Sequence, residues 1–301
     1  YREAHQELEL LWKVKISKGG LRDVTMRHGH VADALIQEKV AYLEATAPTP
    51  TAQPEQLVMC TDGAMVQLTS GEWREVKTVT FGEFGPHWDA KQRKVVTKTD
   101  NISYFSRVEN AATFSRSALV EWHRRGGENA HTVVAVQDGA LWIQSFIDYH
   151  CPQATRVIDF AHAQEYVATV GRAIHGAETD AFQQWYARMS KQLGRQPPQR
   201  TINELRLLQR QHPDHPEGEE IELAIRYLEK RLPMIDYPLF RRRQIPIGSG
   251  NVESGHKVVM QQRMKQAGMR WAEENLNPML ALRVALCNQN WHTSWREIEA
   301  R

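Results

Sequence analysis

Leu57-Val58-Met59-Cys60-Thr61-Asp62-Gly63 decides the fold of this chain. A short, mostly apolar run is followed by an acid and a glycine, and the same order returns in Val133-Val134-Ala135-Val136-Gln137-Asp138-Gly139. Apolar runs that end at turn residues are typical of buried strands. The glycine allows the backbone to turn and a ligand to approach. A plain Asp-Gly hairpin turn would leave the same pattern, so the neighbouring elements must decide between the two interpretations.

Strands and short helices alternate around these two runs. The patterns predict strands at residues 57–61, 74–84, 102–108, 132–137 and 156–160, and helices at 111–125 and 140–150. Ser70-Gly71 supplies the first turn, and Gly126-Gly127 ends the first helix. The order βββαβαβ, with helices short enough to cross between neighbouring strands, is that of the ribonuclease-H-like fold. We therefore expect an α/β protein whose mixed sheet is flanked by helices.

Helical patterns dominate the regions before and after this core. In the N-terminal region, Val31, Leu35, Val40 and Leu43 lie near helical spacing. In the later region, the residues from Thr201 to Glu204 match a capping box, and Pro197-Pro198 separates two helices. The expected division is a helical segment at 1–46, a proline-containing linker at 47–56, the first part of the core at 57–160, an all-α insertion at 161–235, and the last part of the core with C-terminal helices at 236–301.

Three acids are placed to act together in the expected fold. Asp62 lies on the first strand, Asp138 ends the fourth, and Glu253 follows the glycine turn Gly248-Ser249-Gly250 at the start of a helix. Two carboxylates at strand ends and a third on a late helix can hold two divalent cations about 3.5–4 Å apart, the geometry that cuts and joins phosphodiesters. An alternative explanation for an acid at position 253 is that negative charge is favourable in the first turn of a helix.

Asp159 is the rival for the second acid. It also ends a strand, but one strand later than Asp138, which we favour. His162 follows Asp159 at a spacing that suits two roles: a pair that orients the site from behind the metal ligands, or a helix cap. A histidine packed at a helix start would look the same.

A basic stretch surrounds Glu253, which is the only acid between Arg241 and Arg270. A single carboxylate among cations fits a metal ligand beside a track of phosphates. An arginine run such as 241–243 is also typical of a solvated face, and Trp271 could either stack on an unpaired base or pack in the core. The candidate DNA-binding residues are Arg241, Arg242, Arg243, Lys257, Arg263, Lys265, Arg270 and Trp271.

Composition limits the class of protein. The 38 Lys and Arg residues against 36 Asp and Glu residues leave a formal net charge of +2, so a nucleic-acid surface must be a local patch. The three cysteines lie far apart and form no zinc pattern, which favours reduced thiols in a cytoplasmic protein. No apolar run reaches the roughly 18 residues of a membrane span. The chain begins with Tyr1 rather than Met, which predicts that a further region precedes it.

Several segments together resemble the ISKra-type family of bacterial insertion-sequence transposases. They are Cys60-Thr61-Asp62-Gly63, residues 71–77, Asp138-Gly139, Asp159-Phe160-Ala161-His162, residues 247–255 and the tail at 262–291. The resemblance covers residues 57–291, and the combination is far more specific than any one motif. The related Mutator-like group carries a Cys-or-Asp-x-x-His element after its second acid, which Asp159 and His162 match.

The resemblance implies a DDE transposase with Asp62, Asp138 and Glu253 as its metal-binding triad. Its expected cofactor is a pair of Mg²⁺ ions, for which Mn²⁺ can substitute, and its expected partners are transposon ends, target DNA and further copies of the chain. Such enzymes carry DNA-binding helices ahead of the core, where only residues 1–46 stand here, so recognition of the ends is expected largely outside this chain. The alternatives are another ribonuclease-H-like nuclease and a domesticated, transposase-derived DNA-binding protein.

Overall fold

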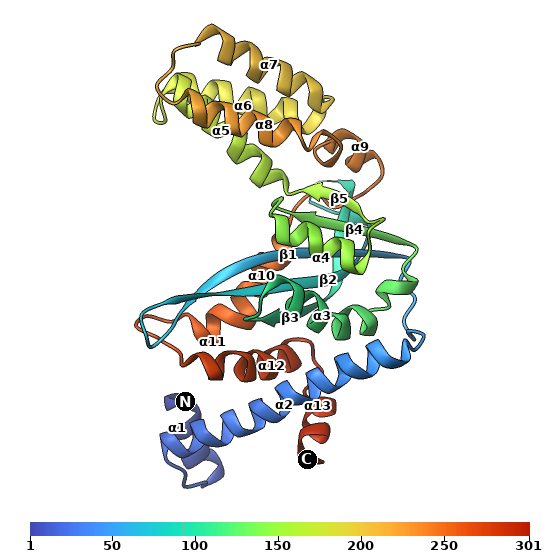
Figure 1. Ribbon diagram of the computed structural model, residues 1–301, viewed down its shortest axis with the longest axis vertical. Coiled ribbons are helices and arrows are strands. Elements are labelled where there is room, and N and C mark those ends of the chain that lie inside the picture. Colours follow the sequence, from blue (N-terminus) through green and yellow to red (C-terminus); the bar gives the residue numbers. More distant parts are fainter. Residues whose placement is uncertain (92) are drawn as a thin grey trace.

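A five-stranded mixed sheet forms the centre of the computed structural model, which describes residues 1–91 and 93–301 (Figure 1). The strands are β1 (Gln56–Gln67), β2 (Trp73–Asp89), β3 (Lys94–Arg107), β4 (Thr132–Gln137) and β5 (Thr155–Ile158), in the order β3-β2-β1-β4-β5. Neighbours β1, β2 and β3 pair antiparallel, whereas β4 runs parallel to β1 and β5 parallel to β4. The expected α/β class and the adjacency of the first and fourth strands are confirmed.

Strand lengths differ from the sequence prediction. β4 has the predicted bounds, but β1 continues through Asp62 and Gly63 and pairs with β2 as far as Gln67 opposite Trp73. The expectation that Asp62 ends its strand is therefore wrong, and so is the Asp-Gly hairpin alternative. The chain turns at Ser70-Gly71, as predicted, where Gly71 has a φ of 92°. β5 stops at Ile158, because Asp159 caps the following helix.

Helices cover both faces of the sheet. Leu57 and Met59 face a core shared with α3 (Ala111–Arg124) and α4 (Leu141–His150). Val58 and Cys60, which alternate with them, face the opposite side, together with Val136. The short helical segments of the chain are η1 (Gly127–Asn129), η2 (Leu232–Met234), α9 (Tyr237–Arg242), α10 (Gly250–Gly255), η3 (His256–Gln261), α11 (Gln262–Met264) and η4 (Glu273–Asn275).

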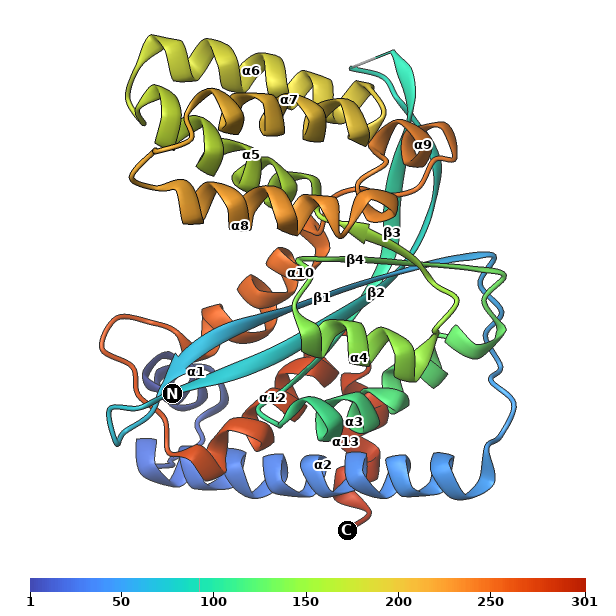
Figure 2. The same cartoon turned by 45° about the horizontal axis from the view of Figure 1, so that its top comes forward.

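A block of four helices stands beyond β5, at the top of Figures 1 and 2. It consists of α5 (Phe160–His175), α6 (Asp180–Arg195), α7 (Pro198–Gln211) and α8 (Gly218–Glu229), and among the described residues no strand falls between 160 and 235. The helical prediction for 161–235 is confirmed, but the capping box at Thr201 is wrong. Pro198 already opens α7, so Thr201 is a buried residue inside the helix and Glu204 instead accepts a hydrogen bond from Gln192.

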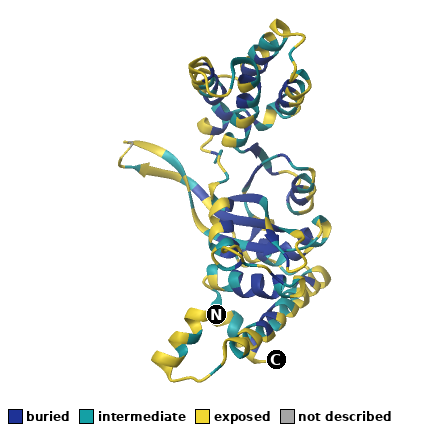
Figure 3. Ribbon diagram, turned by 90° about the vertical axis from the view of Figure 1, so that its left-hand side faces the viewer, coloured by how far each residue is buried: buried dark blue, intermediate teal, exposed yellow. Residues whose placement is uncertain are grey.

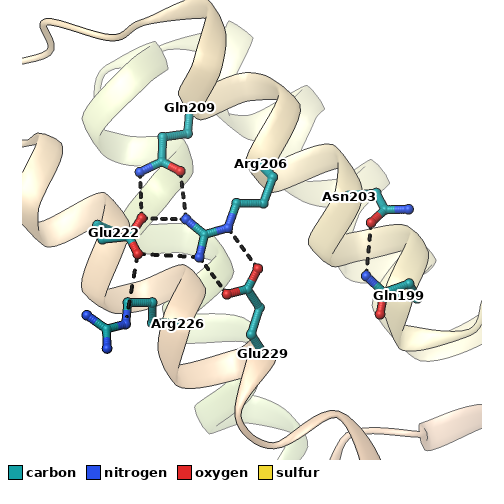
Figure 4. Close-up of polar contacts among 7 residues, drawn as sticks. All are labelled: Gln199, Asn203, Arg206, Gln209, Glu222, Arg226 and Glu229. Atoms are coloured by element: carbon teal, nitrogen blue, oxygen red, sulfur yellow. Dashed lines mark hydrogen bonds and ion pairs between the residues drawn. The ribbon is translucent and has the colours of Figure 1, made fainter.

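A charged network joins α7 to α8 inside this block (Figure 4). The Arg206 guanidinium donates from Nε to one carboxylate oxygen of Glu229 at 2.8 Å and from another nitrogen to the second oxygen. It also donates to Gln209 and Glu222. Arginine presents its donors in a planar fork, which matches two carboxylates at once. The network fixes the orientation of α8, and that orientation matters because α8 reaches the candidate site.

Two helices, rather than one, make up the N-terminal region. α1 (Arg2–Trp12) ends where Lys13 adopts a φ of 56°, and α2 (Lys18–Thr46) begins at the Ser17 cap. The expectation of one helical stretch is wrong over 13–17. α2 packs against α12 (Leu276–Cys287) and α13 (Trp291–Glu299). A Cβ on Gly29 would lie only 2.9 Å from the carbonyl oxygen of Pro278, so glycine permits this close approach.

None of the helices in the described part of the chain is both long and apolar enough to cross a lipid bilayer. Cys60, Cys151 and Cys287 are all free thiols, of which the first two are buried.

Candidate active site

Asp62 and Asp138 lie just past the end of the parallel pairing between β1 and β4. The last pair of that ladder is Cys60 opposite Val136. Each acid follows its member of this pair by two residues, and Asp138 lies close enough to Asp62 to raise its pKa. Side chains two residues apart in a strand point to the same side, and neighbouring strands lie about 4.8 Å apart. Both acids therefore lie on the face that holds Cys60 and Val136.

The Asp62 carboxylate is held in a crowded, negatively charged position. Its Oδ1 accepts the Gly63 backbone N–H at 2.7 Å, and its Oδ2 lies 3.7 Å from Nδ1 of His256. Burial raises the pKa of Asp62, and the carboxylates of Asp138 and Glu75 raise it further against the opposing effects of the Gly63 N–H and His256. A nearby cation would relieve this repulsion.

Asp138 opens a tight turn that the helical block holds from outside. Its Oδ1 accepts the Ala140 N–H at 2.8 Å, and Gly139 takes a φ of 89°. The Tyr227 hydroxyl, on α8, donates to the backbone carbonyl of Asp138, and Arg231, just after α8, donates to that of Gly139 at 3.1 Å. A Cβ on Gly139 would lie 2.4 Å from the Tyr227 oxygen, so only glycine fits under this contact.

Tyr227 is itself fixed on both sides of its ring. It stacks on Tyr166 of α5 with ring centroids 3.8 Å apart, and the Arg231 guanidinium lies 3.9 Å from its centroid. His162 meets both tyrosines edge to face. This observation favours the packed alternative for His162, in a layer of rings that supports the Asp138 turn.

Glu253 lies on α10, which rests on β1 and β2. The approach is close because Gly255 has no side chain: a Cβ there would lie 3.0 Å from the Tyr104 ring and 3.1 Å from Thr80. Val252 points into the same core as Cys60, whereas Glu253 is exposed and, in the described residues, has no hydrogen bond or ion pair.

Asp159 connects α5 to the segment that carries Glu253. Its Oδ1 accepts the His162 N–H at 2.9 Å, so it caps α5. Its Oδ2 accepts both the backbone N–H of Ser249 at 2.6 Å and the Ser249 hydroxyl at 2.8 Å. Because β5 is separated from β1 by β4, Asp138 rather than Asp159 lies next to Asp62. Asp159 is therefore placed as a support for the turn before α10.

His256 was missed by the sequence analysis. It follows Glu253 at a spacing that places both on one side of a helix, and it starts the π-helical turn that continues α10. Its side chain is buried, its Nδ1 faces Asp62, and its Nε2 has no hydrogen-bond partner among the described residues. Burial lowers the pKa of His256, against the raising effect of Asp62.

Lys77 and Glu75 lie beside Gly63 on the other face of the sheet from Asp62 and were not predicted, although the charge of Glu75 still acts on Asp62. Lys77 is buried, donates to Glu75 at 2.6 Å, and lies over the Trp142 ring. The one sequence signal for this ion pair is that the two residues are two positions apart in a strand, which places both side chains on the same face.

The predicted DNA-binding residues divide into exposed and packed groups. Arg242, Arg243, Lys257, Lys265 and Arg270 are exposed. Arg241 is exposed but donates to the Gly194 carbonyl, and Arg263 lies between the rings of Tyr1 and Trp271. Trp271 is buried, and its ring N–H donates to the Met264 carbonyl at 3.0 Å. The packing alternative therefore holds for Trp271, and the base-stacking expectation is wrong.

No three His, Cys, Asp or Glu side chains in the described part of the chain gather closely enough to form a metal site as they stand. The donors available on Asp62 and Asp138 still suit a hard divalent cation, because they are carboxylate oxygens, which Mg²⁺ prefers. The pKa of Asp62 is raised first by burial and to a smaller extent by the negative charges of Asp138 and Glu75. Comparison of the chain with protein-family models gave no match, and comparison with curated proteins gave none either.

The Tyr227 hydroxyl offers a test of how far the helical block supports this site. Tyr227→Phe removes the hydrogen bond to the Asp138 carbonyl and keeps the ring stack, so we expect the free energy of unfolding to fall by about 1 kcal/mol, measured by urea denaturation. Tyr166→Phe, which alters the stacking partner and leaves the Asp138 bond intact, is the matched control. Equal stability of the two variants would show that the hydroxyl contact does not support the Asp138 turn.

Proposed function

We propose that the chain is a DDE transposase with a ribonuclease-H-like core, in which Asp62, Asp138 and Glu253 hold two Mg²⁺ ions. The observation that supports the proposal is the proximity of Asp62 and Asp138: the parallel ladder of β1 and β4 ends at Cys60 opposite Val136, two residues before each acid, and Asp138 helps to raise the pKa of Asp62. Glu253 lies on α10, which packs against β1 and β2. The strand order β3-β2-β1-β4-β5 supports the assignment of the core.

Bound metal ions would activate water and stabilise the attacking and leaving oxygens of an in-line displacement. The protein's part is to hold the acids in place. Asp62 and Asp138 each direct one carboxylate oxygen to a backbone N–H, which leaves the other oxygen for a ligand. Asp159 bonds to the segment before Glu253, and the exposed Lys257 and Lys265 would supply positive charge for a scissile phosphate.

The proposal predicts both cutting and joining of DNA. With a duplex that carries the element's own end, we expect nicking that requires Mg²⁺ or Mn²⁺ and stops when EDTA is added. With an end already cut to a free 3′-hydroxyl, we expect that hydroxyl to become joined to a target plasmid. Both reactions follow from the same two-metal geometry, because each is an attack by an oxygen on a phosphodiester.

The outcomes separate the alternatives. Metal-dependent cutting without joining of the pre-cut end would indicate a nuclease. Binding of DNA with neither reaction, under conditions where both metal ions are present, would indicate a DNA-binding protein and contradict the proposed function.

A further inference from the structure

The hairpin of β2 and β3 extends well beyond the sheet. From Gly85 onward its residues leave the core, and we call residues 85–91 and 93–98 the β2–β3 arm. Within it Trp88 pairs with Val95 and His87 with Val96 across the two strands. Figure 3 shows the arm as a mostly exposed ribbon that projects from one side of the body.

The composition of the arm is unusual for an unsupported ribbon. It carries the exposed cations Lys91, Arg93, Lys94 and Lys98 against a single acid, Asp89. Lys98 also forms an exposed ion pair at 2.7 Å with Asp100, just beyond the arm. Trp88 is 60% exposed and its cross-strand partner Val95 is 52% exposed. A two-stranded ribbon has no core of its own, so a large exposed side chain there gains nothing from packing and instead marks a contact surface.

A groove separates the arm from the segment that leads to the candidate site. It has a volume of about 630 Å³. One wall is the arm from Lys94 to Lys98 with the adjoining Thr99, and the other runs from Arg241 to Asn251. Asn251 precedes Glu253 by two residues, so the groove opens directly onto α10. Figure 2 shows the arm rising beside α9, which carries Arg241.

We infer that the β2–β3 arm and residues 241–251 form a binding groove for duplex DNA, which the arm holds beside the Glu253 helix. The inference rests on the proposed function, since the groove leads to the same carboxylates. Cations on both walls, Lys94 and Lys98 on one and Arg241 on the other, match the charge of a phosphodiester backbone. A two-stranded ribbon also fits the major groove of DNA, which is about 12 Å wide.

A second copy of the chain is the less favoured occupant. Two basic arms that met across a two-fold axis would bring like charges together, and like-charge contacts oppose association. An acidic patch elsewhere on a second copy could accept the arm, so the experiment includes the oligomeric state.

The test compares two variants of the full chain that each lose three positive charges. The arm variant is Arg93→Gln/Lys94→Gln/Lys98→Gln. The control is Lys191→Gln/Arg200→Gln/Arg210→Gln, at exposed positions of the helical block. Binding of a fluorescently labelled duplex is measured by anisotropy over a range of salt concentrations in EDTA, where no cleavage takes place.

The arm variant is expected to lower the slope of log K against log salt by about 2.7 and to weaken binding roughly 10²-fold at about 0.1 M salt. The control variant should change the salt slope and the DNA affinity much less. Trp88→Ala should weaken binding several-fold and leave the slope unchanged, because Trp88 carries no charge. All three should unfold at the wild-type temperature, since none of these side chains is buried.

Equal slopes for the arm variant and the control would overturn the inference. So would an arm variant that changes the molar mass in light scattering and leaves DNA affinity unchanged, because that result would assign the arm to a second copy. Wild-type protein that binds DNA through the arm but never cuts it would contradict the proposed function and leave the arm assignment standing.

Discussion

Asp62→Asn is expected to lower metal-dependent DNA cleavage by about 10³-fold, which corresponds to about 4 kcal/mol of lost transition-state stabilisation. The substitution keeps an oxygen that can accept the Gly63 N–H, and it removes the negative charge that would bind both metal ions. Single-turnover cleavage of a labelled DNA end measures the effect. Glu178→Gln, in the exposed loop between α5 and α6, is the control for the loss of one carboxylate.

The same variant should not lose stability. Because the pKa of Asp62 is raised above its ordinary value of 3.8, the folded protein binds a proton more tightly there than the unfolded chain does. The ionised group therefore opposes folding as the pH rises through the raised pKa. Asparagine removes this charge, so the metal-free variant should unfold at or above the wild-type temperature at neutral pH. A variant that loses both activity and stability would show that Asp62 acts mainly in folding.

Asp159→Ala should destabilise the protein by about 2–4 kcal/mol and slow cleavage by roughly 10²-fold. It removes the cap of α5 and leaves the N–H and hydroxyl of Ser249 without their acceptor. The segment before α10 then loses its anchor, so Glu253 is no longer held beside the strands. Thermal unfolding followed by circular dichroism and single-turnover cleavage measure the two effects.

Two further substitutions identify which contact matters. Asp159→Asn retains the capping oxygen but cannot accept both Ser249 donors, so its effects should be intermediate. Ser249→Ala loses only the hydroxyl bond and should be the mildest of the three. If Asp159→Ala abolished cleavage with no loss of stability, Asp159 would be a metal ligand itself, and its assignment as a support would be wrong.

The sequence predicted the parts of the fold that local pattern controls. The apolar run from Val133 to Val136 predicted the bounds of β4, and the similar run before Asp62 predicted its neighbour, so both acids could be assigned to adjacent strands or their ends. The length of β1 could not be predicted. Gly63 looked like a turn residue, but its role is to leave room across the strand: a Cβ there would lie 2.1 Å from a carboxylate oxygen of Glu75.

Contacts between distant segments set the rest of the candidate site. Nothing local shows that His256 meets Asp62, that Tyr227 reaches the Asp138 carbonyl, or that Asp159 bonds to Ser249, because each pair is joined only by the packing of α8, α10 and the sheet. For Trp271, the local sequence was misleading. Its basic neighbourhood suggested an exposed ring, but the strand Gln56–Gln67 continues far enough for its backbone to bond and bury that tryptophan.

The central claim is that Asp62, Asp138 and Glu253 form one centre for two metal ions, and Mn²⁺ binding followed by electron paramagnetic resonance tests it most directly. In the presence of a DNA end, the wild-type protein should bind two Mn²⁺ ions whose spins are coupled, as expected for ions about 3.5–4 Å apart. Asp62→Asn, Asp138→Asn and Glu253→Gln should each lose the coupled pair, and Glu178→Gln should keep it. Isolated, uncoupled Mn²⁺ in the wild type, or a coupled pair that survives all three substitutions, would contradict the account.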